Sequence, residues 1–235
     1  MRSLAHFGGY VAGAYAADTA AGAYSGETAA GAHSAVSLVG AAVGFVGDGF
    51  LHSHITGVAP RAQGHGVGYV LKRHQRAWAL ERGIATINWT FDPLVRRNAY
   101  FNLGRLGATA TEYLVDFYGD MSDGLNAGQG SDRLVATWSL EAAVPRAEPD
   151  IAALINEKRV TLNVDAAGAP RLEDPAGEGP LLCRLPPDIA ALRVADPGLG
   201  RRWRLAVRTQ VGGAMARGYR VTAATRFGWY VLEAP

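Results

Sequence analysis

The chain of 235 residues contains a single cysteine, Cys183, so it cannot form an internal disulfide framework. A lone thiol without disulfides is typical of a reducing compartment, and we expect a cytoplasmic protein. The sequence also lacks a run of about 20 apolar residues, the length that a helix needs to cross a bilayer. Its first residues lack the basic, apolar and small-residue order of a signal peptide. These absences predict a protein without a membrane partner.

A strong excess of charge of either sign is missing as well. The chain carries 23 Lys and Arg against 21 Asp and Glu, which gives a formal net charge of +2. Such a balance does not require nucleic acid as a partner, and we expect none. Hydrophobic residues make up 49% of the chain, which is enough for one large core or two small ones.

A turn rich in glycine carries most of the chemical information. Gly64, Gly66 and Gly68 alternate with other residues between an expected strand (51–58) and an expected amphipathic helix (67–82). Glycines leave the backbone amides uncovered, and the start of a helix adds a partial positive charge. This combination predicts a binding site for a phosphate or pyrophosphate group.

The turn does not match the two commonest nucleotide-binding patterns. It lacks the Gly-Lys-Ser/Thr ending of a P-loop, and Tyr69 stands where a dinucleotide fingerprint has its third glycine. We therefore expect a different carrier of the phosphate groups.

The spacing of apolar residues predicts an α/β chain. Strands are expected at 7–15, 36–46, 51–58, 84–91, 109–117, 159–164, 181–185, 219–226 and 229–232. Helices are expected at 67–82, at 96–106 and around 197–217. The order of strand, glycine turn, helix and strand predicts parallel pairing across the first crossover.

Residues 51–58 alternate in the way that a strand with two different faces does. Strict alternation places His52, His54, Thr56 and Val58 on one face, with Leu51, Ser53 and Ile55 on the other. Histidine titrates near neutral pH, so His54 and His52 are candidate general bases. Each could equally be a satisfied histidine within the sheet.

The glycine turn resembles the acyl-CoA pyrophosphate loop of the GNAT family of N-acyltransferases. The resemblance rests on Gln63, Gly66 and Gly68, together with the preceding stretch Val58-Ala59-Pro60-Arg61. Further stretches resemble one bacterial group, the predicted GNAT acetyltransferases with an extra C-terminal region. These stretches are His52-Ser53-His54, Trp89–Leu94, Arg97–Leu103, Tyr118-Gly119-Asp120, Ser131-Asp132-Arg133, Trp138, Trp203-Arg204, Arg208 and Gly218–Val221.

The resemblance implies a fold and a division into domains. The fold is α/β (α+β), a mixed and mostly antiparallel sheet with a parallel crossover at the CoA-binding helix. Residues 1–140 would form the acyl-CoA-binding domain, with a low-complexity loop at about 17–35. Residues 141–180 are linker-like with a hairpin, and 181–235 form an α+β extension. From the resemblance we expect the given sequence to begin near the second strand of the family fold, without the first strand and helices.

The resemblance also implies an activity, with acetyl-CoA or another acyl-CoA as co-substrate and no metal. The acyl group would pass directly to a primary amine of a small molecule or amino acid. The residues expected to bind the cofactor are Thr56, Gly57, Val58, Gln63, Gly64, His65, Gly66, Val67, Gly68, Tyr69, Asn98 and Asn102. His54 and His52 would take the proton of the amine, and Tyr100 or Tyr118 would protonate the leaving thiolate.

One departure from the family keeps alternatives open. Many GNAT enzymes carry a tyrosine four residues before the glycine that ends the second helix, and Leu103 stands there in this chain. A non-catalytic acyl-CoA-binding module, an inactive structural protein and an enzyme for another acyl-CoA such as succinyl-CoA are therefore alternatives. A second copy of the chain is a further candidate partner.

Overall fold

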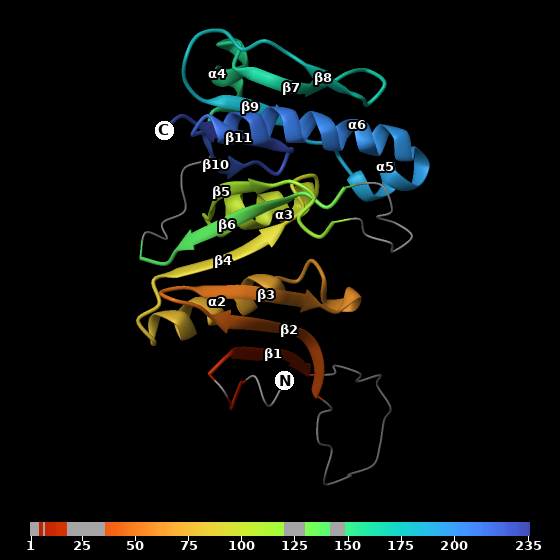
Figure 1. Ribbon diagram of the computed structural model, residues 1–235. Helices are drawn as coiled ribbons and strands as arrows, with labels where there is room; N and C mark the ends of the chain where they lie inside the picture. The colour runs from red at the N-terminus through yellow and green to blue at the C-terminus, as the bar shows by residue number, and fades with distance from the viewer. Residues whose placement is uncertain (1–4, 7, 18–35, 120–129, 142–148) are drawn as a thin grey trace. The chain divides into compact units, whose positions relative to one another are not determined.

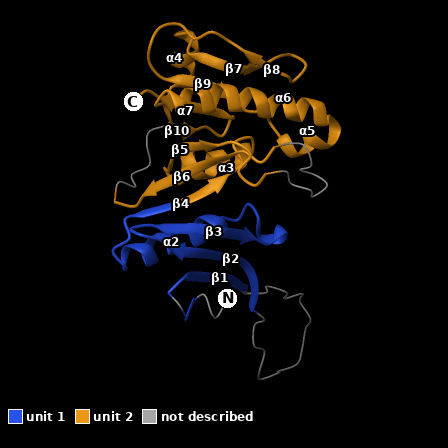
Figure 2. Ribbon diagram, in the orientation of Figure 1, with its two compact units in different colours: residues 1–87 blue, residues 88–235 orange. Residues whose placement is uncertain are grey.

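The computed structural model describes residues 5–6, 8–17, 36–119, 130–141 and 149–235. The expected low-complexity loop at 17–35 lies almost wholly outside these residues. The chain divides into two compact units, Met1–Ile87 and Asn88–Pro235, which Figure 2 colours separately. In the described residues no helix is both long and apolar enough to cross a membrane.

The first unit is an antiparallel sheet with one long helix. Its strands are β1 (Tyr10–Ala17), β2 (Val36–Val46) and β3 (Leu51–Val58), and β2 pairs with both neighbours. A short 3-10 turn (Pro60–Ala62) and the glycine turn lead into α2 (Val67–Leu80). The predicted strands and helix of this unit are confirmed to within a few residues at most ends.

Small residues on β2 allow α2 to lie close to the sheet. A Cβ atom at Gly40 would lie 2.9 Å from Cγ1 of Val67 and 3.1 Å from Cδ1 of Leu71. Gly44 faces the same helix, since a Cβ atom there would lie 3.4 Å from the Gln75 amide nitrogen. Larger side chains at these positions would push the helix away from the strand that precedes the glycine turn.

β3 contains a β-bulge. Gly44 pairs with Ser53 and Val43 pairs with Ile55, so His54 is an extra residue in the ladder. A bulge of this kind shifts the alternation of side chains by one residue and leaves backbone groups without a ladder partner.

The bulge overturns the expected faces of β3. Thr56 pairs with Ala42 and Val58 with Gly40, which places both on the face that α2 covers. His52 pairs with Phe45 on the opposite face. The expectation that His52, His54, Thr56 and Val58 share one face is therefore wrong, because strict alternation cannot account for an inserted residue.

The second unit contains the other strands and most of the helices (Figure 1). In chain order these are β4 (Thr86–Phe91), α3 (Arg96–Ala99), η2 (Tyr100–Arg105), β5 (Thr109–Leu114), β6 (Arg133–Ser139), α4 (Ile151–Asn156), β7 (Val160–Val164), β8 (Pro170–Leu172), β9 (Leu181–Arg184), α5 (Ile189–Ala195), α6 (Pro197–Val207), η3 (Arg208–Gly212), α7 (Gly213–Ala216), β10 (Arg220–Ala224) and β11 (Trp229–Glu233). The spatial order of its strands is β4-β6-β5-β10-β11-β9-β7-β8.

The predicted fold class is confirmed. Antiparallel pairs dominate both units, and β7 with β9 is a parallel pair. The parallel crossover predicted at α2 would join β3 to β4, on either side of the boundary between the units, and stays a prediction.

Residues 149–180 pack on the sheet of the second unit. Ile151 and Leu154 of α4 contact a buried cluster of Val160, Leu182, Trp229 and Val231. The indole of Trp203 donates a hydrogen bond to the carbonyl of Gly168, next to the β7–β8 hairpin. A hairpin was predicted in this segment, whereas the helix α4 was not.

Candidate functional site

The glycine turn of the first unit leaves an open space at the start of α2. Gly66 is the N-cap residue with φ 81°, and no side chain caps the helix. The first turn of α2 contains no acidic residue. Cβ atoms built at Gly64 or Gly66 would meet nothing within 4 Å. The start of α2 therefore carries no capping side chain, and the Cβ positions of Gly64 and Gly66 are open.

Polar side chains bond within the turn and tie it to the strands of the first unit. The amide of Gln63 donates to the carbonyl of Val58 at 3.3 Å, which ties the turn to the end of β3. Nδ1 of His65 lies 3.0 Å from the carbonyl oxygen of Gln63. Arg61 donates to the carbonyl of Leu38 at 3.4 Å and is exposed. The arrangement fits an anionic group such as a pyrophosphate, because amide dipoles and a nearby cation favour negative charge.

The end of β3 is accessible beside this turn. Thr56 and Gly57 are exposed, and Val58 is half-buried. An extended strand segment with accessible backbone groups can hydrogen-bond an extended ligand as a further strand would.

The two candidate histidines lie near each other on β3. Their ring centroids are 5.9 Å apart, and the ring of His54 packs at 5.1 Å against Phe45. His54 is exposed, whereas His52 is half-buried. The bulge therefore brings His54 to the surface beside His52, where either ring could reach a ligand on that face.

The candidate residues of the second helix belong to the second unit. Asn98 is exposed, Tyr100 is half-buried, and Asn102 and Leu103 are buried. Residues 100–105 form a π-helix instead of continuing the α-helix. On an α-helix, Tyr100 and Leu103 would lie about one turn apart on the same face. A π-helix has a different spacing, so this relation does not apply here. π-turns are frequently found at functional sites.

Tyr118 lies in the exposed turn after β5. Its amide donates to Oγ of Ser131 at 2.9 Å, and the Arg133 guanidinium lies 4.7 Å from its ring centre. Its ring also packs against Phe117 at 4.8 Å. The backbone of Tyr118 is thus fixed while its side chain remains exposed.

Asp92, which ends β4, makes a buried ion-pair cluster. Its Oδ1 accepts the amide of Leu94, and both carboxylate oxygens accept from the guanidinium of Arg204. Arg193 donates to Oδ2 at 3.0 Å. Burial alone would raise the pKa of Asp92, but the hydrogen bonds and charge of Arg204 hold it below the ordinary value. The side chain therefore fixes a turn, and nothing in the sequence near Asp92 points to the two distant arginines.

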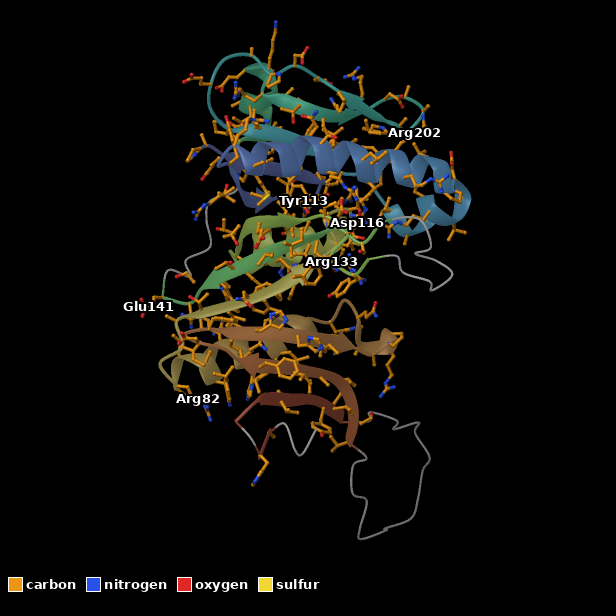
Figure 3. The ribbon with its side chains drawn as sticks, in the orientation of Figure 1. Arg82, Tyr113, Asp116, Arg133, Glu141 and Arg202 are labelled. Atoms are coloured by element: carbon orange, nitrogen blue, oxygen red, sulfur yellow. The ribbon has the colours of Figure 1, made fainter. Side chains whose placement is uncertain are left out.

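A second cluster surrounds Asp132 at the start of β6. Asp132 is fully buried and accepts from Arg208 at 2.6 Å and from the Tyr113 hydroxyl at 2.7 Å. Asp116 accepts from the same guanidinium at 3.0 Å. Figure 3 labels Tyr113 and Asp116. Burial would raise the pKa of Asp132, and the hydrogen bond from Arg208 is the largest influence that lowers it instead.

Lys72 is a buried cation that sequence reasoning missed. Its ammonium group donates to Oγ of Ser53 at 2.8 Å and to the Gln75 amide oxygen at 3.3 Å. Burial lowers its pKa to about 7. No local signal in the sequence reveals that this side chain turns inward. In the described part of the chain, no group of three or more His, Cys, Asp and Glu residues could hold a metal ion.

Comparison with known proteins gives matches among solved structures only. No family model and no curated protein matches the sequence. Nourseothricin acetyltransferase is 24% identical, with a TM-score of 0.38 over 44% of this chain and 58% of that chain. A GNAT family acetyltransferase from Elizabethkingia anophelis with acetyl-CoA bound is 16% identical, with a TM-score of 0.38 over 44% and 69%. These matches are acetyltransferases.

The ribosomal-protein-S18-alanine N-acetyltransferase of Escherichia coli matches in the same way. It is 18% identical, with a TM-score of 0.37 over 48% of this chain and 66% of that chain. The matched part spans less than two thirds of nourseothricin acetyltransferase. With TM-scores below 0.5, the activity must be argued from the residues of the chain itself.

Proposed function

We propose that this chain is an acyl-CoA-dependent N-acyltransferase that acts on a primary amine of a small molecule or amino acid. The observation that carries the proposal is the glycine turn at the start of α2. It combines a sequence that resembles the GNAT pyrophosphate loop with an uncapped helix end and open space above Gly64 and Gly66. Acetyl-CoA is the proposed co-substrate.

The first unit would bind the cofactor through backbone groups. The amides from Gly64 to Tyr69 would hold the pyrophosphate, with Gln63 fixing the turn through Val58. The strand end at Thr56, Gly57 and Val58 would pair with the pantetheine arm, as the resemblance implies. Asn98 and Asn102 of the second unit stay proposed contacts.

The proposed reaction needs a base, a group that stabilises the oxyanion, and an acid. A bound acyl-CoA supplies a thioester whose carbonyl carbon an amine can attack. His54 would remove the proton of the amine, and His52 is the second candidate. Backbone amides near the bulge would donate to the developing oxyanion. Tyr118 or Tyr100 would give a proton to the departing sulfur.

A second candidate function is supported by one observation. Leu103, at the position where many GNAT enzymes have their acidic tyrosine, is buried and apolar. A non-catalytic acyl-CoA-binding module would keep the glycine turn and lose the acid. Succinyl-CoA or another acyl-CoA would use the same turn, because the pyrophosphate is common to all of them.

Calorimetry with acetyl-CoA and with succinyl-CoA tests the binding step. Gly66→Leu should weaken binding at least about tenfold, because its side chain enters the space where the pyrophosphate would lie. Gly83→Leu is the matched control: it has φ 69° at the other end of α2 and equally open surroundings. Equal affinity of the two variants would refute the placement of the site.

Release of free thiol over a panel of amines separates the two candidate functions. The enzyme predicts release with at least one primary amine. Binding of acyl-CoA without release with any amine would favour the binding module instead.

A further inference from the structure

Two hairpins of the second unit repeat one pattern of strand pairing. In β5 the pairing with β6 skips one residue, Thr111, two positions after the strand begins. In β10 the pairing with β11 skips Thr222, also two positions after the strand begins. Both hairpins therefore contain the same bulge at the same place in the ladder.

The elements that precede these hairpins repeat as well. Each hairpin follows a helix that contains a π-turn, η2 in one case and η3 in the other. Each helix is followed by a glycine with positive φ, Gly107 at 73° and Gly218 at 96°. Three residues after these glycines come Ala110 and Val221, and these two residues pair with each other.

The strand order has the symmetry that this central pair requires. In the order β4-β6-β5-β10-β11-β9, the strands β9, β11 and β10 correspond to β4, β6 and β5. The two sets of three strands therefore run outward in opposite directions from the central β5–β10 pair. The helices cross over in a reciprocal way. Gly104 of η2 lies against the carbonyl of Ala224 in β10, and Gly212 of η3 lies against the ring of Tyr113 in β5. Each copy thus packs its helix on a strand of the other.

We infer that residues 181–233 are a second copy of the motif formed by the described residues 86–119 and 130–139, and that they act as its built-in partner subunit. In symmetric dimers, two copies of one surface complete each other, and an uncovered edge strand invites pairing with another chain. Here β10 covers the edge of β5 from within the same chain. A second copy of the whole chain would have to bind elsewhere.

Charged side chains of the second copy also bind to the first copy. α6 and η3 of the second copy supply Arg204 to Asp92 and Arg208 to Asp132 and Asp116. All three acceptors belong to the first copy, at the ends of its strands. The second copy therefore holds turns of the first copy in place. One of them is the turn that carries Asp116 and Tyr118, where Arg208 binds Asp116 and the amide of Tyr118 donates to Oγ of Ser131.

Cleavage of the full chain between the copies tests this inference without reference to CoA. A protease recognition sequence inserted after Glu141, at the end of β6, allows the folded protein to be cut in solution (Figure 3). The two fragments are expected to remain together at the mass of the uncut chain. Separation of the wild-type fragments on dilution to micromolar concentration would overturn the inference.

Two matched pairs of variants test which contacts hold the partner. Arg208→Ala should raise the dissociation constant of the cut fragments at least about tenfold, whereas Arg202→Ala, on an exposed position of α6, should not change it. Gly212→Leu should weaken the association of the two fragments, because the new side chain meets the ring of Tyr113. Gly213→Leu should leave the association unchanged, because its side chain meets only the end of Arg217. Circular dichroism of each uncut variant shows whether it folds. Equal dissociation constants within both pairs would contradict the inference.

Discussion

His54 shows how a single inserted residue can create a candidate catalytic position. The bulge exposes its ring beside His52 without breaking the strand on either side. Bulges are over-represented next to active sites because they redirect one side chain. A base at this position would act from rigid backbone that leads directly into the glycine turn.

Substitution of His54 by alanine tests its proposed role. General-base catalysis contributes about 10²–10⁴-fold to a rate, so kcat/KM should fall by a factor in that range. Affinity for acetyl-CoA should stay unchanged. His52→Ala is the comparison, and the histidine whose loss lowers kcat/KM more is the base. Full rates in both variants would refute the assignment.

Lys72 predicts a dependence of stability on pH. Its pKa is about 7 in the folded chain and about 10.4 in an unfolded one. Between these values the unfolded state binds more protons, so the free energy of unfolding rises with pH by up to about 1.4 kcal/mol per unit. Urea unfolding of Lys72→Met should lack this rise, and exposed Arg73→Met should keep it. The same slope in both variants would contradict the prediction.

At this scale the sequence predicts backbone features better than side-chain surroundings. Gly64 and Gly66 could be placed because a glycine turn before a helix is a local pattern. Lys72 could not, since its inward direction depends on Ser53 in another element. The role of Asp92 could not be placed either, because its partner Arg204 lies far along the chain.

The helix α6 contributes a buried ion pair that its own sequence does not predict. Arg204 is buried and pairs with Asp92, whereas Arg202 on the same helix is exposed. Figure 3 labels Arg202 on α6, apart from Tyr113 and Asp116. The helix therefore presents one face with buried charges to the sheet.

Removing one partner of this buried pair should be costly. Arg204→Ala leaves the Asp92 carboxylate buried without its main partner, and we expect a loss of about 3–5 kcal/mol in the free energy of unfolding. Arg202→Ala should change it by less than about 0.5 kcal/mol. Urea unfolding of both variants provides the comparison. A loss below about 1 kcal/mol in Arg204→Ala would show that the pair contributes little.

Elements with a strong local period were predicted well, and irregular ones were not. The strands 36–46 and 51–58 agree with β2 and β3, because apolar runs and a glycine turn mark their ends. The helix predicted at 96–106 has the right extent, but its second half is a π-turn. Gly104, where a Cβ would lie 2.6 Å from the carbonyl oxygen of Ala224, shows that distant packing shapes this segment.

For the whole molecule, the clusters around Asp92 and Asp132 predict sensitivity to acid. Both carboxyl groups have a lowered pKa in the folded state. Their stabilising contribution is complete above the unfolded pKa of about 3.9 and is lost as the pH falls through the lower folded values.

Urea unfolding below about pH 4 measures this contribution. The free energy of unfolding should fall as the pH decreases, and less steeply in Asp132→Asn than in the wild type. Asp165→Asn, in the exposed β7–β8 turn, is the control and should follow the wild type. Parallel curves for all three proteins would show that the buried carboxylates do not govern the acid response.

The proposed function of the whole molecule depends on where an acyl-CoA binds. Amide hydrogen exchange of the full chain, with and without saturating acetyl-CoA, tests this most directly. Binding at the glycine turn should slow exchange in the segment from Gln63 to Tyr69, with no such change in Gly66→Leu. Binding that leaves the exchange of this segment unchanged would contradict the assignment of the glycine turn as the pyrophosphate site.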